Sequence, residues 1–136
     1  MPLNVEVLEQ SFDRVRPHAT EFASSFYNNL FTDYPQLRPL FANTTMADQE
    51  KKFIWSLVLV IKNIRKPDYL TCILKNLGER HVRYGTMRED YPMVGATLLK
   101  TFESYLGTDW TPEVEQAWTE AYGAIVNLML EGAKRY

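Results

Sequence analysis

The sequence predicts an all-α protein of about seven helices in a single domain, residues 1–136. Apolar residues recur at steps of three and four along most of the chain, which is the spacing of a helix face. No segment alternates apolar and polar residues around an Asn-Gly or Asp-Gly turn, so no strands are expected. A chain of 136 residues that is 46% hydrophobic and 13% aromatic fits one domain with its own core.

The first third of the chain shows three helical segments. The first helix is expected over residues 4–16, with Pro17 ending it or forming a corner. Residues 22–31 place aromatic and aliphatic side chains at helical spacing and predict the second helix. Pro35 and Pro39 then bracket a short helical turn, since proline suits the start of a helix and breaks its interior.

Two longer helices follow. Residues 53–64 keep one apolar face, and Thr45 with Asp48 resembles a capping box before that helix. Residues 69–81 outline the next helix, and Gly85 lies just beyond its end.

The last two helices carry terminal signals. One is expected over residues 92–106, opened by Pro92 and closed by Gly107. Thr111 can cap the final helix with Pro112 at its first position, and the apolar face of that helix continues to Met129.

Charge and composition narrow the setting in which the protein acts. Fifteen basic and seventeen acidic residues give a net charge of −2, which does not favour nucleic acid as a partner. Cys72 is the single cysteine and cannot form an internal disulfide. The apolar run "FIWSLVLVI" stops at Lys62, too short to cross a membrane, and the first residues lack signal-peptide order. The default expectation is therefore a soluble, cytoplasmic protein.

Few residues offer catalytic chemistry. The sequence has no nucleophile elbow, no phosphate-binding glycine loop and no Cys or His pair at zinc spacing. His81 lies near the end of a helix, in "LGERHVRYG". A neutral imidazole there could turn one nitrogen to a metal while its other N–H donates to the carbonyl of Leu77. Taken alone, His81 is more readily a partly exposed histidine with no function.

Four further residues would suit a flat apolar cofactor. Gln49 and Phe53 are four apart and share a helix face, so the amide could bind a ligand that the ring crowds. Tyr27 lies on an aromatic helix face, where its hydroxyl needs a partner such as a ligand or a carbonyl. Phe41 is apolar in a polar neighbourhood. Each of these residues also has an ordinary explanation as core or surface.

Taken together, these segments resemble a globin over nearly the whole chain. The chain is most similar to bacterial single-domain haemoglobins and the haem domain of flavohaemoglobins. The matching segments, in order, are "FYNNLF", "YPQLRPLF", "LGERHVRYG", "YPMVGATLLKTFESYLG" and "WTEAYGAIVNLM", the last two also similar to neuroglobins. The resemblance implies the three-over-three helical sandwich of globins and a haem cofactor, expected to be haem b. It also implies that His81 is the axial iron ligand, Tyr27 the distal tyrosine and Phe41 the phenylalanine packed on haem.

The distal helix is less firmly aligned, because the polar loop "ANTTMAD" precedes it. The alignment places Gln49 at the distal position and Phe53 over the ligand. Lys52 could then reach a haem propionate, with a solvated lysine as the equal alternative. A slip of one residue would instead bring Asp48 or Glu50 to the ligand, which is less plausible because a carboxylate donates no hydrogen bond.

The resemblance also has implications for the His81 side of the haem and for whether the second histidine could bind the iron. His18 belongs to the first corner and should be too far away to ligate the iron. Tyr91 matches the flavohaemoglobin tyrosine that is tied to the proximal histidine. Ala133 stands where a glutamate is expected, and Glu131 two residues earlier lies on another helical face.

Three functions follow from these expectations. The first is reversible binding of dioxygen or other diatomic ligands for storage, delivery or sensing, with Tyr27 and Gln49 stabilising the bound ligand. The second is nitric oxide dioxygenation, for which electrons would come from a separate reductase because no flavin domain follows. The third is a cofactor-free module of globin fold, or one that holds a bilin through Cys72.

Overall fold

The computed structural model describes residues 3–134, and all of their regular secondary structure is helical. Six α-helices and three short 3-10 helices make up the described part of the chain, which confirms the all-α prediction. In chain order they are α1 (Val5–Val15), η1 (Arg16–His18), α2 (Ala19–Asp33), η2 (Pro35–Phe41), α3 (Met46–Lys62), α4 (Pro67–Arg83), α5 (Asp90–Leu106), η3 (Gly107–Asp109) and α6 (Pro112–Ala133).

Most helix ends fall where local sequence signals place them. Thr111 caps α6 by accepting a hydrogen bond from the Val114 N–H at 3.2 Å. Gly85 and Gly107 follow α4 and α5 with positive φ angles of 87° and 55°, which glycine adopts without a Cβ penalty. The predicted capping box at Thr45 is wrong: Thr45 is the N-cap of α3, but its side chain makes no capping hydrogen bond.

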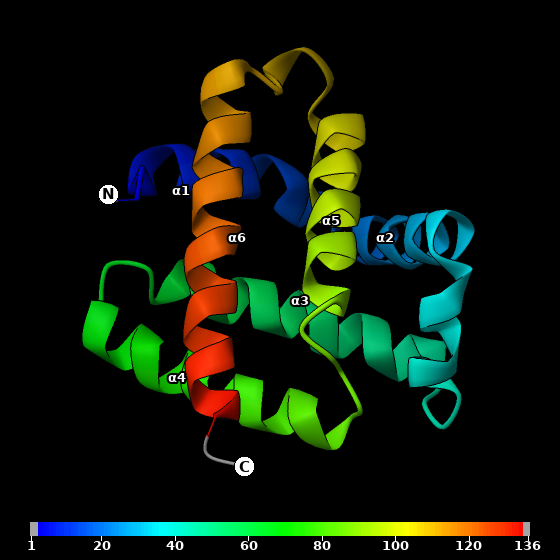
Figure 1. Ribbon diagram of the computed structural model, residues 1–136. Coiled ribbons are helices and arrows are strands. Elements are labelled where there is room, and N and C mark those ends of the chain that lie inside the picture. The colour runs from blue at the N-terminus through cyan, green and yellow to red at the C-terminus, as the bar shows by residue number, and fades with distance from the viewer. Residues whose placement is uncertain (1–2, 135–136) are drawn as a thin grey trace.

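The helices cross in layers (Figure 1). α5 and α6 lie side by side and run in opposite directions, and α1 to α4 run across them. α2 packs on both α3 and α5, while α4 packs mainly on α6. Aromatic rings meet in the core between these layers: the Phe102 ring is stacked on Trp118 at 4.2 Å and tilted against Phe22 at 4.8 Å between ring centroids.

Glycines set the close approach of α4 to α6. A Cβ on Gly78 would overlap the Met129 carbonyl, and a Cβ on Gly132 would overlap the Lys75 carbonyl. Only glycine allows the two backbones to meet at these points. This crossing fixes the position of α4, which carries His81 at its C-terminal end.

One buried hydrogen bond anchors α1 to α6. The Trp118 Nε1–H donates to the Ser11 hydroxyl at 2.8 Å, and both side chains are buried. The bond satisfies the indole N–H, which would otherwise be a costly unpaired donor in the core.

Between residues 3 and 134, no helix combines the length and the apolar character that crossing a bilayer requires.

Candidate functional site

An aromatic cluster surrounds Tyr27 on α2. Its ring centroid lies 5.6 Å from that of Phe41, 5.7 Å from that of Phe53 and 6.0 Å from that of Phe31, with the first two in edge-on contact. Tyr27 is 5% exposed. The structure thus brings together Tyr27, Phe41 and Phe53, which the sequence singled out separately, in one apolar environment.

Gln49 on α3 reaches into this cluster and binds Tyr27. Its side-chain N–H donates to the Tyr27 hydroxyl oxygen at 3.0 Å, so the phenolic proton is free to point elsewhere. Burial raises the pKa of Tyr27 to about 12; the Gln49 hydrogen bond opposes this rise, and the charge of Glu50 adds to it. Tyr27 therefore stays a hydrogen-bond donor at neutral pH.

The helix register selects Gln49 over its neighbours. Asp48 is exposed, and the Glu50 carboxylate instead accepts a hydrogen bond from the Ser24 hydroxyl at 2.8 Å. The one-residue slip considered from the sequence would need one of these carboxylates beside Tyr27. The position facing Tyr27 is an amide, which can donate a hydrogen bond.

His81 forms the second part of the site, near the end of α4. Its Nδ1 lies 2.8 Å from the Leu77 carbonyl oxygen, as the sequence predicted. The carbonyl accepts only from a protonated Nδ1, so the neutral ring carries its lone pair on Nε2. Burial lowers the pKa of His81, the Leu77 bond opposes that, and nearby Arg80 adds to the lowering. The ring is therefore held neutral, in the form that can ligate a metal.

Two tyrosines lie against the His81 ring. Tyr91 is nearly parallel to it at 6.4 Å between centroids, and Tyr84 is tilted at 5.6 Å. Burial raises the pKa of Tyr91, and the charge of Asp90 adds to this effect. The sequence had paired Tyr91 with His81 only through the family resemblance.

Tyr122 on α6 was not foreseen, although it fixes the start of α5. Its hydroxyl donates to the Tyr91 carbonyl at 2.7 Å, and its ring fills the space that a Cβ on Gly95 would need. A glycine inside an otherwise apolar helix is a sequence signal of close approach. That signal marks Gly95 but does not identify its partner.

The remaining predicted residues lie outside these contacts. Lys52 is exposed on α3, and His18 is exposed at the corner between α1 and α2. Glu131 is exposed and lies 3.7 Å from the Lys75 ammonium, so its carboxylate is engaged away from His81. Ala133 is partly buried at the end of α6.

The two parts of the site lie at the same end of the α3–α4 pair. These helices run in opposite directions, so the first turns of α3 and the last turns of α4 come to one side of the molecule (Figure 1). Gln49 is in the first turn of α3, and His81 is in the last turn of α4. The described residues contain no group of three or more His, Cys, Asp or Glu placed to hold a metal ion.

The chain belongs to the globin family, since the Globin family model matches residues 24–129. It is 31% identical over 130 residues to a flavohemoprotein of Xylella fastidiosa, a match covering 94% of this chain and 32% of that protein. A flavohemoprotein of Rhizobium meliloti is 29% identical over 114 residues, covering 82% of this chain and 28% of the relative. The chain thus spans about a third of the length of these relatives.

Solved structures show the same fold. A bacterial globin from Campylobacter jejuni superposes with a TM-score of 0.82 at 24% identity, covering 96% of this chain and 94% of the other. An engineered carbene transferase from Rhodothermus marinus superposes with a TM-score of 0.85 at 25% identity, covering 96% and 91%.

Proposed function

We propose that this globin binds haem through His81 and reversibly binds dioxygen and other diatomic ligands on the opposite side, for storage, delivery or sensing in the cytoplasm. The single observation that carries the proposal is the hydrogen bond between Gln49 and Tyr27. It holds together two side chains that can each donate to a ligand, in the aromatic cluster beside Phe41 and Phe53. Family membership supports the same reading.

The residues present fit a haem, expected to be haem b. His81 offers one neutral imidazole nitrogen, and no cluster of further protein ligands accompanies it among the described residues. That donor set suits an iron already held by four porphyrin nitrogens. Phe41 and Phe53 supply apolar surface for a flat ring, and exposed Lys52 could pair with a propionate at the solvent edge. When bound, haem supplies an iron with an open position for a diatomic ligand.

The distal residues would then stabilise the ligand by donation. The Tyr27 hydroxyl oxygen accepts a hydrogen bond from Gln49, so the hydroxyl proton is left to donate to the ligand. Accepting one hydrogen bond also makes the hydroxyl a stronger donor. A buried donor aimed at partial negative charge slows ligand release. On the other side, Leu77 fixes the His81 ring, and Tyr91 lies against it.

Haem titration of two histidine variants tests the cofactor assignment. His81→Ala should lose tight haem binding and the stability that haem confers, while His18→Ala should behave as the parent, because His18 is exposed at a distant corner. Optical spectra of the ferric, ferrous and oxygenated forms supply the readout. A normal five-coordinate ferrous spectrum in His81→Ala would refute the role of His81.

Nitric oxide dioxygenation is the second candidate. The relatives are named flavohemoproteins, and this chain spans about a third of their length. In this second proposal a reductase supplies the electrons. Tyr27 and Gln49 suit this reaction equally. Stopped-flow mixing of the oxygenated protein with nitric oxide separates the two candidates. Repeated turnover with an added reductase favours the enzyme, and a single stoichiometric burst favours the binding protein.

The third function expected from the sequence is a cofactor-free module or one that holds a bilin through Cys72, and the exposure of Cys72 argues against the bilin. Cys72 is exposed on α4, so a pigment attached there would lie outside the core. A colourless protein after haem feeding would favour the cofactor-free form, and a Soret band would exclude both forms.

A further inference from the structure

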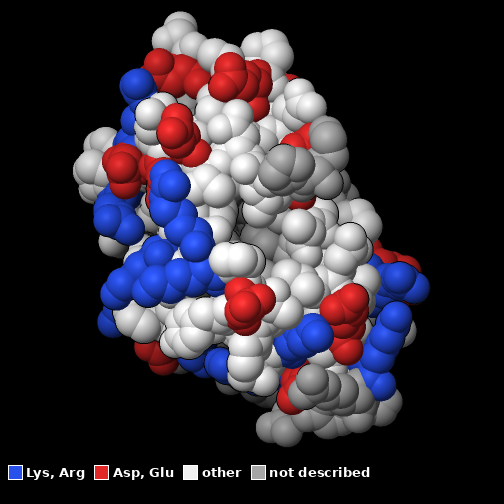
Figure 2. Space-filling view, turned by 90° about the vertical axis from the view of Figure 1, so that its left-hand side faces the viewer, with Lys and Arg blue, Asp and Glu red and all other residues white. Residues whose placement is uncertain are grey.

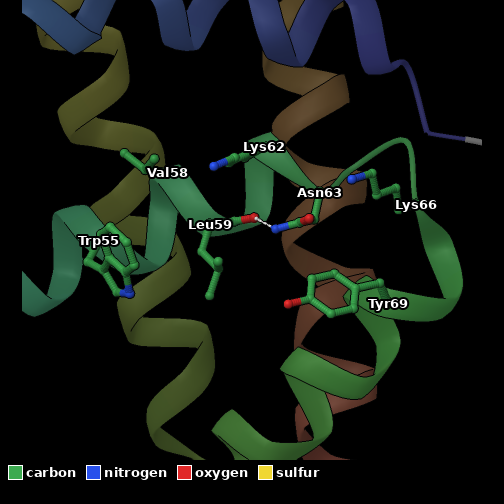
Figure 3. A pocket seen from close by; sticks show the side chains of 7 residues that line it. All are labelled: Trp55, Val58, Leu59, Lys62, Asn63, Lys66 and Tyr69. Atoms are coloured by element: carbon green, nitrogen blue, oxygen red, sulfur yellow. Dashed lines mark hydrogen bonds between the residues drawn. The ribbon is translucent and has the colours of Figure 1, made fainter.

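A pocket lies at the opposite end of the α3–α4 pair from His81. Its volume is about 590 Å³, and it is formed by the last two turns of α3, the connecting residues 63–66 and the first turn of α4 (Figure 3). A volume of this size is within the range of small-molecule sites. Tyr69 in this pocket precedes His81 by twelve residues of one helix, which is roughly 18 Å along its axis. The pocket is therefore separate from the proposed haem site and does not depend on it.

Two large aromatic side chains line this α3–α4 pocket while remaining open to solvent. Trp55 is 67% exposed and Tyr69 is 58% exposed, whereas most large apolar side chains among the described residues are buried or partly buried. Figure 3 shows Tyr69 extending from α4 toward the α3 side of the pocket, where Leu59 points into the same space. Exposed aromatic rings around a concavity are suited to stack on a flat apolar ligand.

The pocket also carries unneutralised positive charge. Lys62 and Lys66 both line it, and neither forms an ion pair within the described residues. Arg65 between them is engaged by the Glu9 carboxylate at 2.7 Å. No Asp or Glu lines the pocket, although Asp68 lies beside Tyr69 in the chain and is exposed.

Basic side chains are concentrated on part of this end of the molecule. The end of the molecule where α3 leads into α4 is turned toward the viewer in Figure 2, and Lys and Arg side chains gather over the left-hand part of that face. The chain as a whole carries a net charge of −2, so this local surplus is set by placement and not by composition. An anion is the ligand that such a surface attracts.

Asn63 gives the pocket a fixed polar wall. It is 5% exposed, and its side-chain N–H donates to the Leu59 carbonyl at 2.8 Å (Figure 3). That bond holds the Asn63 amide in one orientation. In the sequence, Asn63 lies between the two lysines. In Figure 3 both lysine side chains lie on the Asn63 side of the pocket, and the Trp55 ring lies on the other side, toward the N-terminal end of α3. Positive charge thus lies toward one side, and aromatic surface is available beside it.

We propose that the α3–α4 pocket binds a small organic anion with a flat aromatic body, such as an aromatic carboxylate. The carboxylate pairs with Lys62 and Lys66, and the ring packs against Trp55, Tyr69 and Leu59. Binding is reversible and involves no covalent step.

Isothermal titration calorimetry of the full chain, in the form in which it is purified, tests this with 2-naphthoate as the probe. We expect one saturable site with a dissociation constant below about 1 mM. The uncharged 2-naphthamide should bind about tenfold more weakly or not at all, because it keeps the rings and lacks the charge. Backbone amide NMR shifts should cluster on residues 55–69.

Matched variants separate charge from shape. The double variant Lys62→Met and Lys66→Met should weaken 2-naphthoate binding about tenfold, and Trp55→Ala should weaken both probes. Lys51→Met removes an exposed lysine of the same helix that lies outside the pocket, so it should leave binding unchanged. Absence of saturable binding, binding indifferent to the two lysines, or NMR shifts centred on Tyr27 and His81 would each overturn the proposal.

Discussion

Removing the Tyr27 hydroxyl is the sharpest test of the proposed distal site. The hydroxyl is buried, stays protonated and accepts from Gln49 at 3.0 Å, so its own proton is available to a ligand. One hydrogen bond to a charged or partly charged group contributes about 1.5–3 kcal/mol. Because about 1.4 kcal/mol is a factor of ten, Tyr27→Phe would raise the oxygen dissociation rate by roughly 10- to 150-fold if nothing compensated.

Gln49 limits the size of this effect. In the parent protein the Tyr27 oxygen occupies one of its two amide N–H groups, and Tyr27→Phe releases that donor. The freed amide can turn to the ligand, so we expect the single variant to fall near the lower end, at about tenfold. If the freed amide compensates in this way, Gln49→Ala should raise the rate by a larger factor in the Tyr27→Phe background than in the parent protein, which is the sign of a coupled pair.

Stopped-flow displacement of oxygen by carbon monoxide measures these rates directly. Tyr105→Phe is the matched control, since it removes the hydroxyl of a partly buried tyrosine, which lies 2.9 Å from the Ser25 hydroxyl and outside the Tyr27 cluster. Its oxygen dissociation rate should equal that of the parent. If Tyr27→Phe leaves the rate unchanged while the protein remains folded, Tyr27 does not donate to the ligand, and the account of the distal side is wrong.

Three other outcomes are expected. With the pKa of Tyr27 at about 12, oxygen dissociation measured by stopped flow should stay flat between roughly pH 6 and pH 9, and a step in that range would contradict Tyr27 as the donor. Ser11→Ala leaves the buried Trp118 N–H unpaired and should lower the free energy of unfolding, measured in urea, by about 1–3 kcal/mol. The control is Ser56→Ala, which removes an exposed bond to the Lys52 carbonyl and should change the free energy of unfolding by less than about 0.5 kcal/mol. Gly78→Ala forces α4 away from the Met129 carbonyl and should lower the free energy of unfolding by about 1–3 kcal/mol. Gly123→Ala, which has open space around it, should raise the free energy of unfolding by up to about 1 kcal/mol. Equal effects of the two variants would show that the α4–α6 approach is not tight.

The helices were predictable because their signals are local. Pro17 lies in the 3-10 turn that separates α1 from α2, and Thr111 caps α6 as its sequence position suggested. Each of these signals acts over a few residues, through a fixed φ angle or a nearby N–H. Thr45 shows the limit, since the right residue at the N-cap still makes no side-chain bond.

The candidate site was predictable only in part. The His81–Leu77 bond follows from helix geometry, because it joins residues four apart. The bonds from Gln49 to Tyr27 and from Tyr122 to Tyr91 join residues 22 and 31 positions apart. Such partners depend on how helices cross, which periodicity does not encode. The resemblance placed Gln49 and Tyr27 on one side of the site, but it did not predict the bond between them.

The packing explains why the distal donors can be ordered independently of His81. Tyr27 and Gln49 lie on α2 and α3, which pack on each other, whereas His81 lies on α4, which packs on α6 through Gly78 and Gly132. Each half of the site is thus held by its own helix pair, and residues 63–66 connect them in the chain. A flat cofactor bound between the two halves would therefore not be needed to order the side chains of either half. Its binding free energy would be available to join them, which is why removing the His81 bond should affect stability as well as haem affinity.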